Sequence, residues 1–169
     1  CDGTGRKTYM LKLAAERLTG SSQDGYTNSA MEWGQQTEEA ARSYYAQAFG
    51  EVKEVGFVEK DDWVGASPDG LIDTDGLLEI KCPNSTTHIE NILAEKMPTK
   101  YRPQVQGQLW VTERQWCDFV SFDPRVQARP FLRVRIERDD AYISKLAAAV
   151  EVFVKELKEL LEKVQQGPF

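Results

Sequence analysis

Hydrophobic and polar residues alternate along the first half of the chain with a helical period, and then with shorter ones. Apolar residues recur every three or four positions over residues 7–20 and again over 27–50, and a glycine ends each stretch. This spacing predicts two helices with glycine terminators, the second starting from Thr27 or Asn28 as N-cap. Two short strands are predicted next, in "EVKEVGFVE" and "DDWVGA".

The second half of the chain returns to helical spacing before it changes to strand-like composition. Helices are predicted in "THIENILAEKM" and in "RPQVQGQLWVT", where Pro103 falls in the first turn. Strands rich in β-branched and aromatic residues follow in "QWCDFVSFD" and "PFLRVRIER". A long amphipathic helix over "DDAYISKLAAAVEVFVKELKELLEKV" starts with acids that complement its dipole.

The predicted order is two helices, three strands, two helices, two strands and a final helix. It favours the α/β (α+β) class, with a central mixed β-sheet flanked by helices. No apolar run approaches the roughly 18 residues of a membrane helix, so no membrane partner is expected. At 169 residues, with 41% hydrophobic and 28% charged residues, the chain is expected to form one domain over residues 1–169.

An acidic hairpin connects the two halves. The turn signal "DTDG" at 73–76 should use its glycine for the φ > 0 position. Strand alternation then puts Glu79 and Lys81 on one face and turns Ile80 into the core. On the paired strand, Asp69 is expected near the level of Lys81.

Two carboxylates and an ammonium group would thus converge on one small surface. Mg²⁺ typically takes one or two carboxylates and keeps several waters, so Asp69, Glu79 and the Ile80 backbone carbonyl are expected to form an open metal site. Lys81 would orient or help deprotonate the attacking water and steady charge at phosphorus. The alternative is a solvated hairpin with a Glu79–Lys81 ion pair, worth about 0–1 kcal/mol. Spacing alone leaves both alternatives open.

Charge and cysteine content restrict the class of function further. The net charge of −6 argues against a passive nucleic-acid coat protein but is compatible with a metal-dependent nuclease. Cys1, Cys82 and Cys117 are odd in number and far apart, which indicates neither a disulfide framework nor a zinc site and suits a reducing cytosol. Because the chain opens on Cys1 rather than methionine, we expect the N-terminal part of the domain to be missing.

The hairpin resembles the PD-(D/E)xK nuclease core, with Pro68-Asp69 as "PD" and Glu79-Ile80-Lys81 as "ExK". The ordered blocks "SPDGL…GLLEIKCP", "QVQGQLWVT", "FDPR" and "IERDDAY" further resemble the phage lambda exonuclease (YqaJ-type viral recombinase) family. This resemblance runs from about Gly34 to the last helix. It implies a restriction-endonuclease-like core and two Mg²⁺ ions, with Mn²⁺ able to substitute.

The same resemblance assigns a role to the second helix, whose "GQQTEEAAR" is similar to the family's G-x-x-x-E-x-x-A-R pattern. It places Glu38 beside the metals, at the second ion or the water in its shell. The alternative is that Glu38 and Glu39 are surface acids and Arg42 makes an ordinary helix salt bridge. Gly34 costs about 1 kcal/mol relative to alanine in mid-helix, which predicts close packing there. Glu59 falls near a further acidic position of the family.

Resemblance also implies the residues that touch DNA. It places Tyr101 and Gln104 near the active site, where Gln104 would hydrogen-bond the scissile or terminal phosphate, and Ser67 where it helps to seat a 5′-phosphate. The alternative for Gln104 and for Gln108, one turn later, is an exposed polar helix face.

Arg133 and Arg135 share a strand face and would either track a DNA backbone or form the outer face of an amphipathic strand. His88, the only histidine, is expected in a loop or at a helix start. No Ser-His-Asp or Cys-His arrangement is evident, so covalent catalysis is not expected.

Together with the predicted metal site, the resemblance implies a Mg²⁺-dependent 5′→3′ exonuclease that degrades one strand of linear double-stranded DNA to mononucleotides. The resemblance places it in phage or prophage homologous recombination, in the cytoplasm of a bacterial host. It further implies a homotrimeric ring around DNA and a single-strand annealing protein as partner. A structure- or sequence-selective DNA endonuclease on the same core is the alternative, and a degenerate DNA-binding or structural module is a third interpretation.

Overall fold

The computed structural model describes residues 3–22 and 29–166. Contacts divide the chain into two compact units, residues 1–27 with 147–169 and residues 28–146. Whether both units belong to a single domain stays a prediction. Within the described ranges, no helix combines the length and the apolar character that crossing a membrane requires.

The smaller unit contains helix α1 (Thr4–Thr19) and the second part of helix α5 (Asp140–Gln165). As predicted, Gly20 ends α1: it adopts φ +66° and its N–H bonds the Glu16 carbonyl at 2.9 Å. The two helices meet through an ion pair between Arg6 Nη1 and Glu156 Oε2 at 2.6 Å. The rings of Tyr9 and Phe153 stack beside it.

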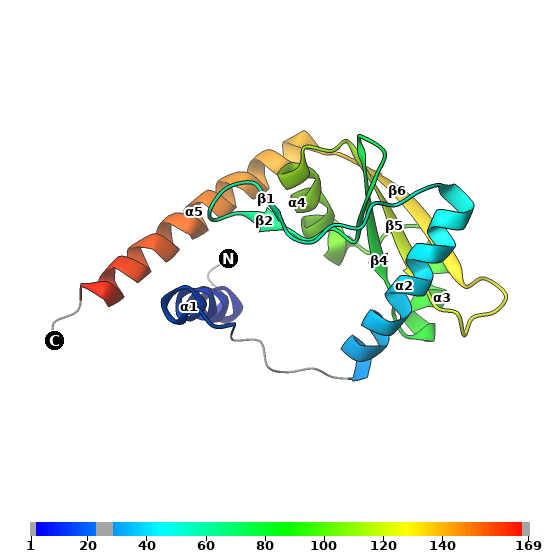
Figure 1. Cartoon of the computed structure of the whole chain (residues 1–169), viewed down its shortest axis with the longest axis horizontal. Helices are drawn as coiled ribbons and strands as arrows, with labels where there is room; N and C mark the ends of the chain where they lie inside the picture. Colours follow the sequence, from blue (N-terminus) through cyan, green and yellow to red (C-terminus); the bar gives the residue numbers. More distant parts are fainter. Residues whose placement is uncertain (1–2, 23–28, 167–169) are drawn as a thin grey trace. The chain divides into compact units, whose positions relative to one another are not determined.

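The larger unit is a mixed sheet with helices on both faces, as the sequence predicts (Figure 1). In chain order its elements are α2 (Ser29–Phe49), β1 (Val58–Glu59), β2 (Gly65–Ala66), β3 (Gly70–Ile72), β4 (Gly76–Lys81), α3 (Ser85–Ala94), the 3₁₀ turn η1 (Thr99–Tyr101), α4 (Arg102–Thr112), β5 (Trp116–Phe122), β6 (Phe131–Glu137) and the start of α5. The main sheet has the order β3-β4-β5-β6, in which only β4 and β5 are parallel. Strands β1 and β2 form a separate two-stranded ribbon. Four strands rather than three precede α3, because the hairpin contributes two.

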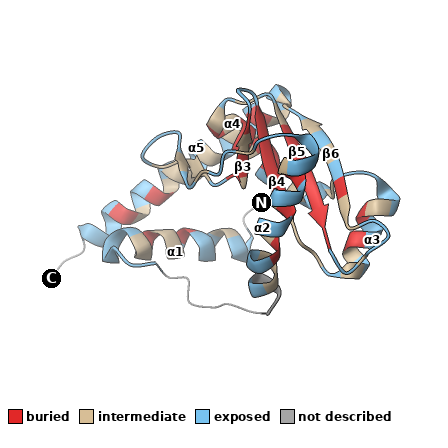
Figure 2. Ribbon diagram, turned by 45° about the vertical axis from the view of Figure 1, so that its right-hand side comes forward, coloured by how far each residue is buried: buried red, intermediate tan, exposed pale blue. Residues whose placement is uncertain are grey.

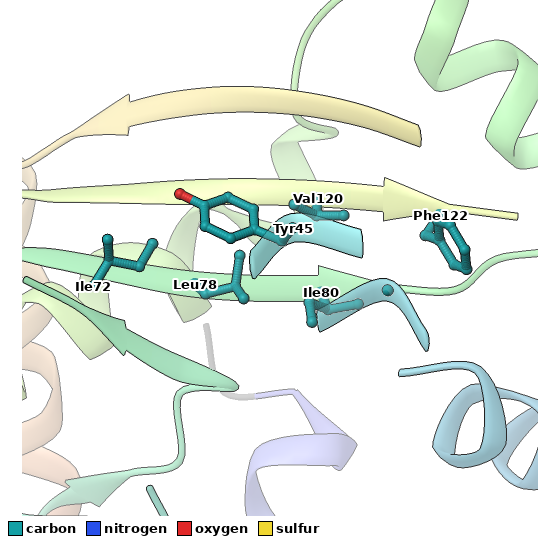
Figure 3. Close-up of a cluster of buried hydrophobic side chains, with 7 residues drawn as sticks. Tyr45, Ile72, Leu78, Ile80, Val120 and Phe122 are labelled. Carbon is teal, nitrogen blue, oxygen red and sulfur yellow. The ribbon is translucent and has the colours of Figure 1, made fainter. Parts of the chain in front are cut away.

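Strands β4 and β5 are buried along most of their length because helices cover the sheet on both sides (Figure 2). On one face, Tyr45 from α2 packs against Leu78, Ile80, Val120 and Phe122 (Figure 3). On the other face, Leu77 and Cys117 meet Val105 and Leu109 of α4 and Ile143 of α5. Ile80 therefore points into the core as predicted, and the alternate residues Glu79 and Lys81 share the α4 face.

The hairpin corrects two expectations. Its positive-φ residue is Asp73 (φ +44°), and Gly76 instead provides room: a Cβ on it would lie 2.2 Å from the Trp116 ring. The loop spans residues 73–75 and Gly76 already pairs with Ile72. This shifts the register, so that Asp69, whose N–H bonds the Leu78 carbonyl at 3.1 Å, lies beside Glu79 rather than Lys81.

Two helical residues also differ from expectation. A Cβ on Gly34 would meet no atom within 4 Å, so the predicted close packing is wrong. His88 lies near the start of α3 as expected, but it is fully buried, with Nδ1 2.8 Å from Ser121 Oγ and Nε2 3.0 Å from the Arg129 carbonyl oxygen. The predicted N-caps of α2, Thr27 and Asn28, fall outside the described residues.

Candidate active site

The acidic hairpin, helix α4 and helix α2 together bring the predicted site residues into one cluster. Glu79 and Lys81 lie at the end of β4, and Asp69 immediately precedes β3. Helix α4 supplies Gln104 and Gln108, one turn apart. The cluster thus combines segments from three regions of the chain.

Glu79 is fully buried, and each of its oxygens has a side-chain donor. Oε1 accepts from Gln104 Nε2 at 2.7 Å and lies 2.5 Å from Lys81 Nζ, while Oε2 accepts from Gln108 Nε2 at 2.7 Å. A buried carboxylate needs such partners because burial penalises the charged form. The solvated hairpin is therefore wrong for Glu79, and so is the exposed helix face for Gln108, which is 3% exposed.

The Asp69 carboxylate lies close to two other acids, Glu79 and Glu38. Its Oδ2 accepts a hydrogen bond from the Ile80 N–H at 2.6 Å. Burial, and next the charge of Glu79, raise the pKa of Asp69 to about 7, and Glu38 adds to the increase. The Ile80 hydrogen bond and Lys81 oppose it. The site therefore has more negative charge than its own cations balance.

Lys81 keeps its charge despite partial burial. Burial alone would lower its pKa, but the nearby Glu79 and Asp69 carboxylates outweigh burial and raise the pKa above the usual lysine value. The Nζ also lies 5.4 Å from the ring centroid of Tyr101, which places the predicted Tyr101 at the site. A charged ammonium here is suited to stabilising negative charge on a substrate.

Helix α2 joins the cluster through Arg42. As one alternative predicted, Arg42 Nη2 pairs with Glu38 Oε1 at 2.5 Å, and Glu39 is exposed. The structure adds that Arg42 Nε donates to the Asp69 backbone carbonyl at 3.1 Å. Helical spacing indicated the ion pair between Arg42 and Glu38. It carried no signal for the hydrogen bond from Arg42 to the Asp69 carbonyl, which holds the segment that bears Asp69.

The donor atoms of this cluster fit a hard divalent cation. Within the described ranges, no three acidic, histidine or cysteine side chains group closely enough to hold an ion by themselves. Mg²⁺ needs fewer, since one or two carboxylates, a carbonyl and waters suffice. The Ile80 N–H faces Asp69, and in a strand the carbonyl of the same residue turns to that side. Asp69, Glu79 and the Ile80 carbonyl are therefore suitable ligands, whereas Glu38 as ligand of a second ion stays a prediction.

Other predicted residues lie beside the cluster or away from it. Ser67 is exposed just before Asp69, and its carbonyl accepts from Gln108 Nε2 at 3.3 Å. Glu59 is exposed on β1, and its metal role stays a prediction. Arg133 and Arg135 share a strand face as predicted, but it is the sheet face opposite to Glu79.

The two arginines have a structural partner that the sequence did not reveal. Asp118, fully buried on β5, accepts from Arg135 Nε and Nη2 at 2.8 and 2.9 Å, from Arg133 Nη1 at 3.1 Å and from the Tyr45 hydroxyl at 2.6 Å. Burial would raise the pKa of Asp118, but the bonds from Arg135 and Tyr45 lower it overall. The one signal was an acid within the apolar run of β5. Whether the arginines also contact DNA stays a prediction.

Comparison with known proteins places this geometry in a family context. The model of the YqaJ-like viral recombinase domain matches residues 3–115. Two crystal structures of LHK-Exo, an alkaline exonuclease from Laribacter hongkongensis, superpose with TM-scores of 0.91 and 0.90 at 41% identity, over 98% of this chain and 86% of theirs. One of them is a complex with dAMP.

Two further proteins match less closely. A phage-related exonuclease from Haemophilus somnus 129PT shares the fold, with a TM-score of 0.69 at 18% identity over 94% of this chain and 83% of that one. The protein ExoD of Escherichia coli (strain K12) is 30% identical over 70 residues, which is 41% of this chain and 80% of ExoD.

Proposed function

The chain belongs to the family of the YqaJ-like viral recombinase domain, and from this premise we propose that it is a Mg²⁺-dependent exonuclease that degrades one strand of linear double-stranded DNA from 5′ to 3′. A nuclease of phage recombination is the part that the family and the alkaline exonuclease LHK-Exo support directly. The metal and the direction of digestion are the proposal. The observation that carries it is the fully buried Glu79, held by two amides and an ammonium beside Asp69.

Each residue of the cluster has a role in this reaction. Asp69, Glu79 and the Ile80 carbonyl would hold the first ion, and Glu38 would serve the second. The bound ions would polarise the phosphodiester and lower the pKa of the attacking water. The Lys81 ammonium then stabilises the charge that develops on phosphorus.

Residues at the exposed side of the cluster would bind the DNA end. Gln104 is exposed as well as bonded to Glu79, so its amide can exchange this bond for one to the scissile or terminal phosphate. Ser67 would help to seat a 5′-phosphate, and Tyr101 would line the site next to Lys81. Arg133 and Arg135 would contact the DNA backbone from the opposite sheet face.

Mononucleotides are the expected product. LHK-Exo has been crystallised with dAMP, which is a mononucleotide. By family resemblance we further propose a homotrimeric ring, a single-strand annealing protein as partner, and action in the cytoplasm of a bacterial host that carries the phage or prophage. Sedimentation of the protein with and without DNA would measure the assembly.

A single labelling experiment tests substrate and direction together. Linear duplex, labelled at the 5′ or the 3′ end of one strand, is incubated with Mg²⁺, with Mn²⁺ or with EDTA. We expect early release of the 5′ label as mononucleotide with either metal and none with EDTA, and faster release from 5′-phosphorylated ends. Early release of the 3′ label would contradict the proposed direction. Rapid cleavage of covalently closed circles would instead favour the endonuclease alternative.

A further inference from the structure

Gln108 has one polar atom that the cluster leaves without a partner. Its side chain is 3% exposed, and Nε2 donates to Glu79 Oε2 at 2.7 Å and to the Ser67 carbonyl at 3.3 Å. Its Oε1 is buried, and no donor within the described residues reaches it. An unsatisfied buried acceptor costs about 1–3 kcal/mol. Such an atom in a native site calls for a donor from outside the chain, such as a bound water molecule.

Reversing the amide does not remove the problem. The carbonyl oxygen of Gln108 would then face Glu79 Oε2, an acceptor against an acceptor, and the NH₂ group would lose both of its present partners. The contact with Glu79 therefore fixes the amide orientation. Because Oε1 and Nε2 share one amide carbon, Oε1 lies close to the Glu79 carboxylate without facing its Oε2.

We propose that Gln108 is a positioning residue of the metal site: its Nε2 holds Glu79 in the orientation that binds the ion, and its Oε1 accepts a hydrogen bond from a water molecule that the ion carries. This inference rests on the proposed function. Mg²⁺ keeps several waters when proteins bind it, and these waters are hydrogen-bond donors. Partners behind the first ligands commonly orient those ligands and tune the affinity for the metal.

Gln104 and Gln108 of α4 have different roles in the proposed site. Gln104 is exposed and can turn toward substrate, whereas Gln108 is buried and has no such freedom. Gln108 also joins Glu79 to the Ser67 carbonyl, two positions before Asp69. It thereby fixes the spacing between the two carboxylates that would share the ion.

The test compares Gln108→Met with Gln106→Met. Gln106 is 2% exposed on the same helix, but its amide bonds the Glu137 carbonyl and the Asp139 N–H, each at 2.9 Å, away from Glu79. Mn²⁺ binding is titrated without DNA by electron paramagnetic resonance, and circular dichroism checks the fold. For Gln108→Met we expect the Kd for Mn²⁺ to rise about 10- to 100-fold. The metal concentration needed for half-maximal activity should rise in parallel, whereas Gln106→Met should lower the melting temperature and leave the Kd unchanged.

Other outcomes decide against the inference, and they are distinct from failure of the proposed function. Wild-type affinity for Mn²⁺ in a folded Gln108→Met protein would overturn the positioning role. If Gln108→Met does not fold, Gln108→Asn replaces it: the shorter amide keeps polarity but cannot reach Glu79, so a wild-type Kd there would overturn the role equally. Wild-type protein that binds no Mn²⁺, or a Glu79→Gln variant that binds it normally, would instead overturn the metal-dependent function and this inference with it.

Discussion

At the scale of single residues, buried acids in the described part of the chain have two kinds of hydrogen-bond partner. Asp118 and Asp123 are fully buried, and arginines neutralise both. Glu79 is equally buried but bonds two neutral amides and one lysine. Asp69 adds a second carboxylate to the same place. The arginine-paired acids stabilise the fold, while the pair without arginines is left with a charge that a metal ion can balance.

Lys81 can be tested against Lys100, a lysine that lies near the same Tyr101 ring but does not pair with Glu79. The Nζ atoms of Lys81 and Lys100 lie 5.4 and 4.9 Å from the ring centroid of Tyr101, but only Lys81 pairs with Glu79. We expect Lys81→Ala to lower kcat on linear duplex by about 10²-fold or more, the usual effect of removing a group that stabilises the transition state. Lys100→Ala should stay near wild type. If Lys81→Ala instead keeps the near-wild-type activity expected of Lys100→Ala, Lys81 takes no part in the reaction.

Asp123 provides a pH-dependent prediction at an acid outside the proposed metal site. Burial opposes its ionisation, but hydrogen bonds from Arg125 and Ser85 outweigh burial and hold the pKa of Asp123 at about 2. The pKa in the unfolded chain is about 3.9, so the carboxylate stabilises the fold fully above that value. This stabilisation is lost as the pH falls through about 2.

The variant that checks this is Asp123→Asn, compared with wild type by urea unfolding at pH 7, 5 and 3. We expect the wild-type protein to be more stable by on the order of 2 kcal/mol at pH 7 and 5. The difference should shrink at pH 3, because Asp123 of the unfolded chain, with a pKa of about 3.9, is largely protonated there while the folded protein still holds it ionised. A difference that is constant with pH would mean that the charge of Asp123 contributes nothing.

At the scale of elements, packing rather than backbone conformation explains the glycine of the hairpin. Gly76 starts β4 and has no positive φ, yet the Trp116 ring of β5 lies where a Cβ would be. Gly34, in the middle of α2, faces no atom within 4 Å. The same residue type is thus required in the sheet and unnecessary in the helix.

These two glycines form a matched pair for alanine substitution. Gly76→Ala should destabilise the protein by about 1–3 kcal/mol, because the added methyl group overpacks the contact with Trp116. Gly34→Ala should stabilise it by up to about 1 kcal/mol through higher helix propensity. Thermal unfolding monitored by circular dichroism measures both changes. Destabilisation by Gly34→Ala would indicate a contact of α2 outside the described residues.

At the scale of the whole molecule, an acidic protein has to bind a polyanion. The chain has a net charge of −6 and a pI near 5.0, so attraction to DNA depends on local basic groups and not on the overall charge. Arg133 and Arg135 on β6 are such groups, with 36% and 43% of their side chains exposed. Their shared partner Asp118 cancels only one of the two charges.

Arg133→Ala separates a DNA contact from a structural role. Arg135 alone gives Asp118 two hydrogen bonds, so this carboxylate stays paired when Arg133 is removed. If Arg133 contacts a phosphate, the variant should bind duplex more weakly, with a salt dependence lower by about one ion. The melting temperature should change little. An unchanged affinity and salt dependence would assign Arg133 to the fold alone.

The sequence by itself determined the helices, the strands of the main sheet and the central group of site residues. Helical and strand periods are local properties, so α4 was predicted to the residue and the shared face of Glu79 and Lys81 followed from alternation. Asp69 followed from the predicted hairpin, and the family motif supported it. What the local pattern could not give was the hairpin register, because one more residue in the loop moves every pair across it.

Only the tertiary structure decided which distant partners each buried acid acquires. The amide of Gln108 reaches Glu79 across 29 positions of sequence, and Arg135 reaches Asp118 across 17. No periodicity encodes such pairs, because they depend on how α4 and β6 pack against the central strands. The sequence therefore determined which residues form the proposed site. The packing decided that Glu79 is buried, oriented and joined to Gln108, since burial and hydrogen bonding arise only when separate elements meet.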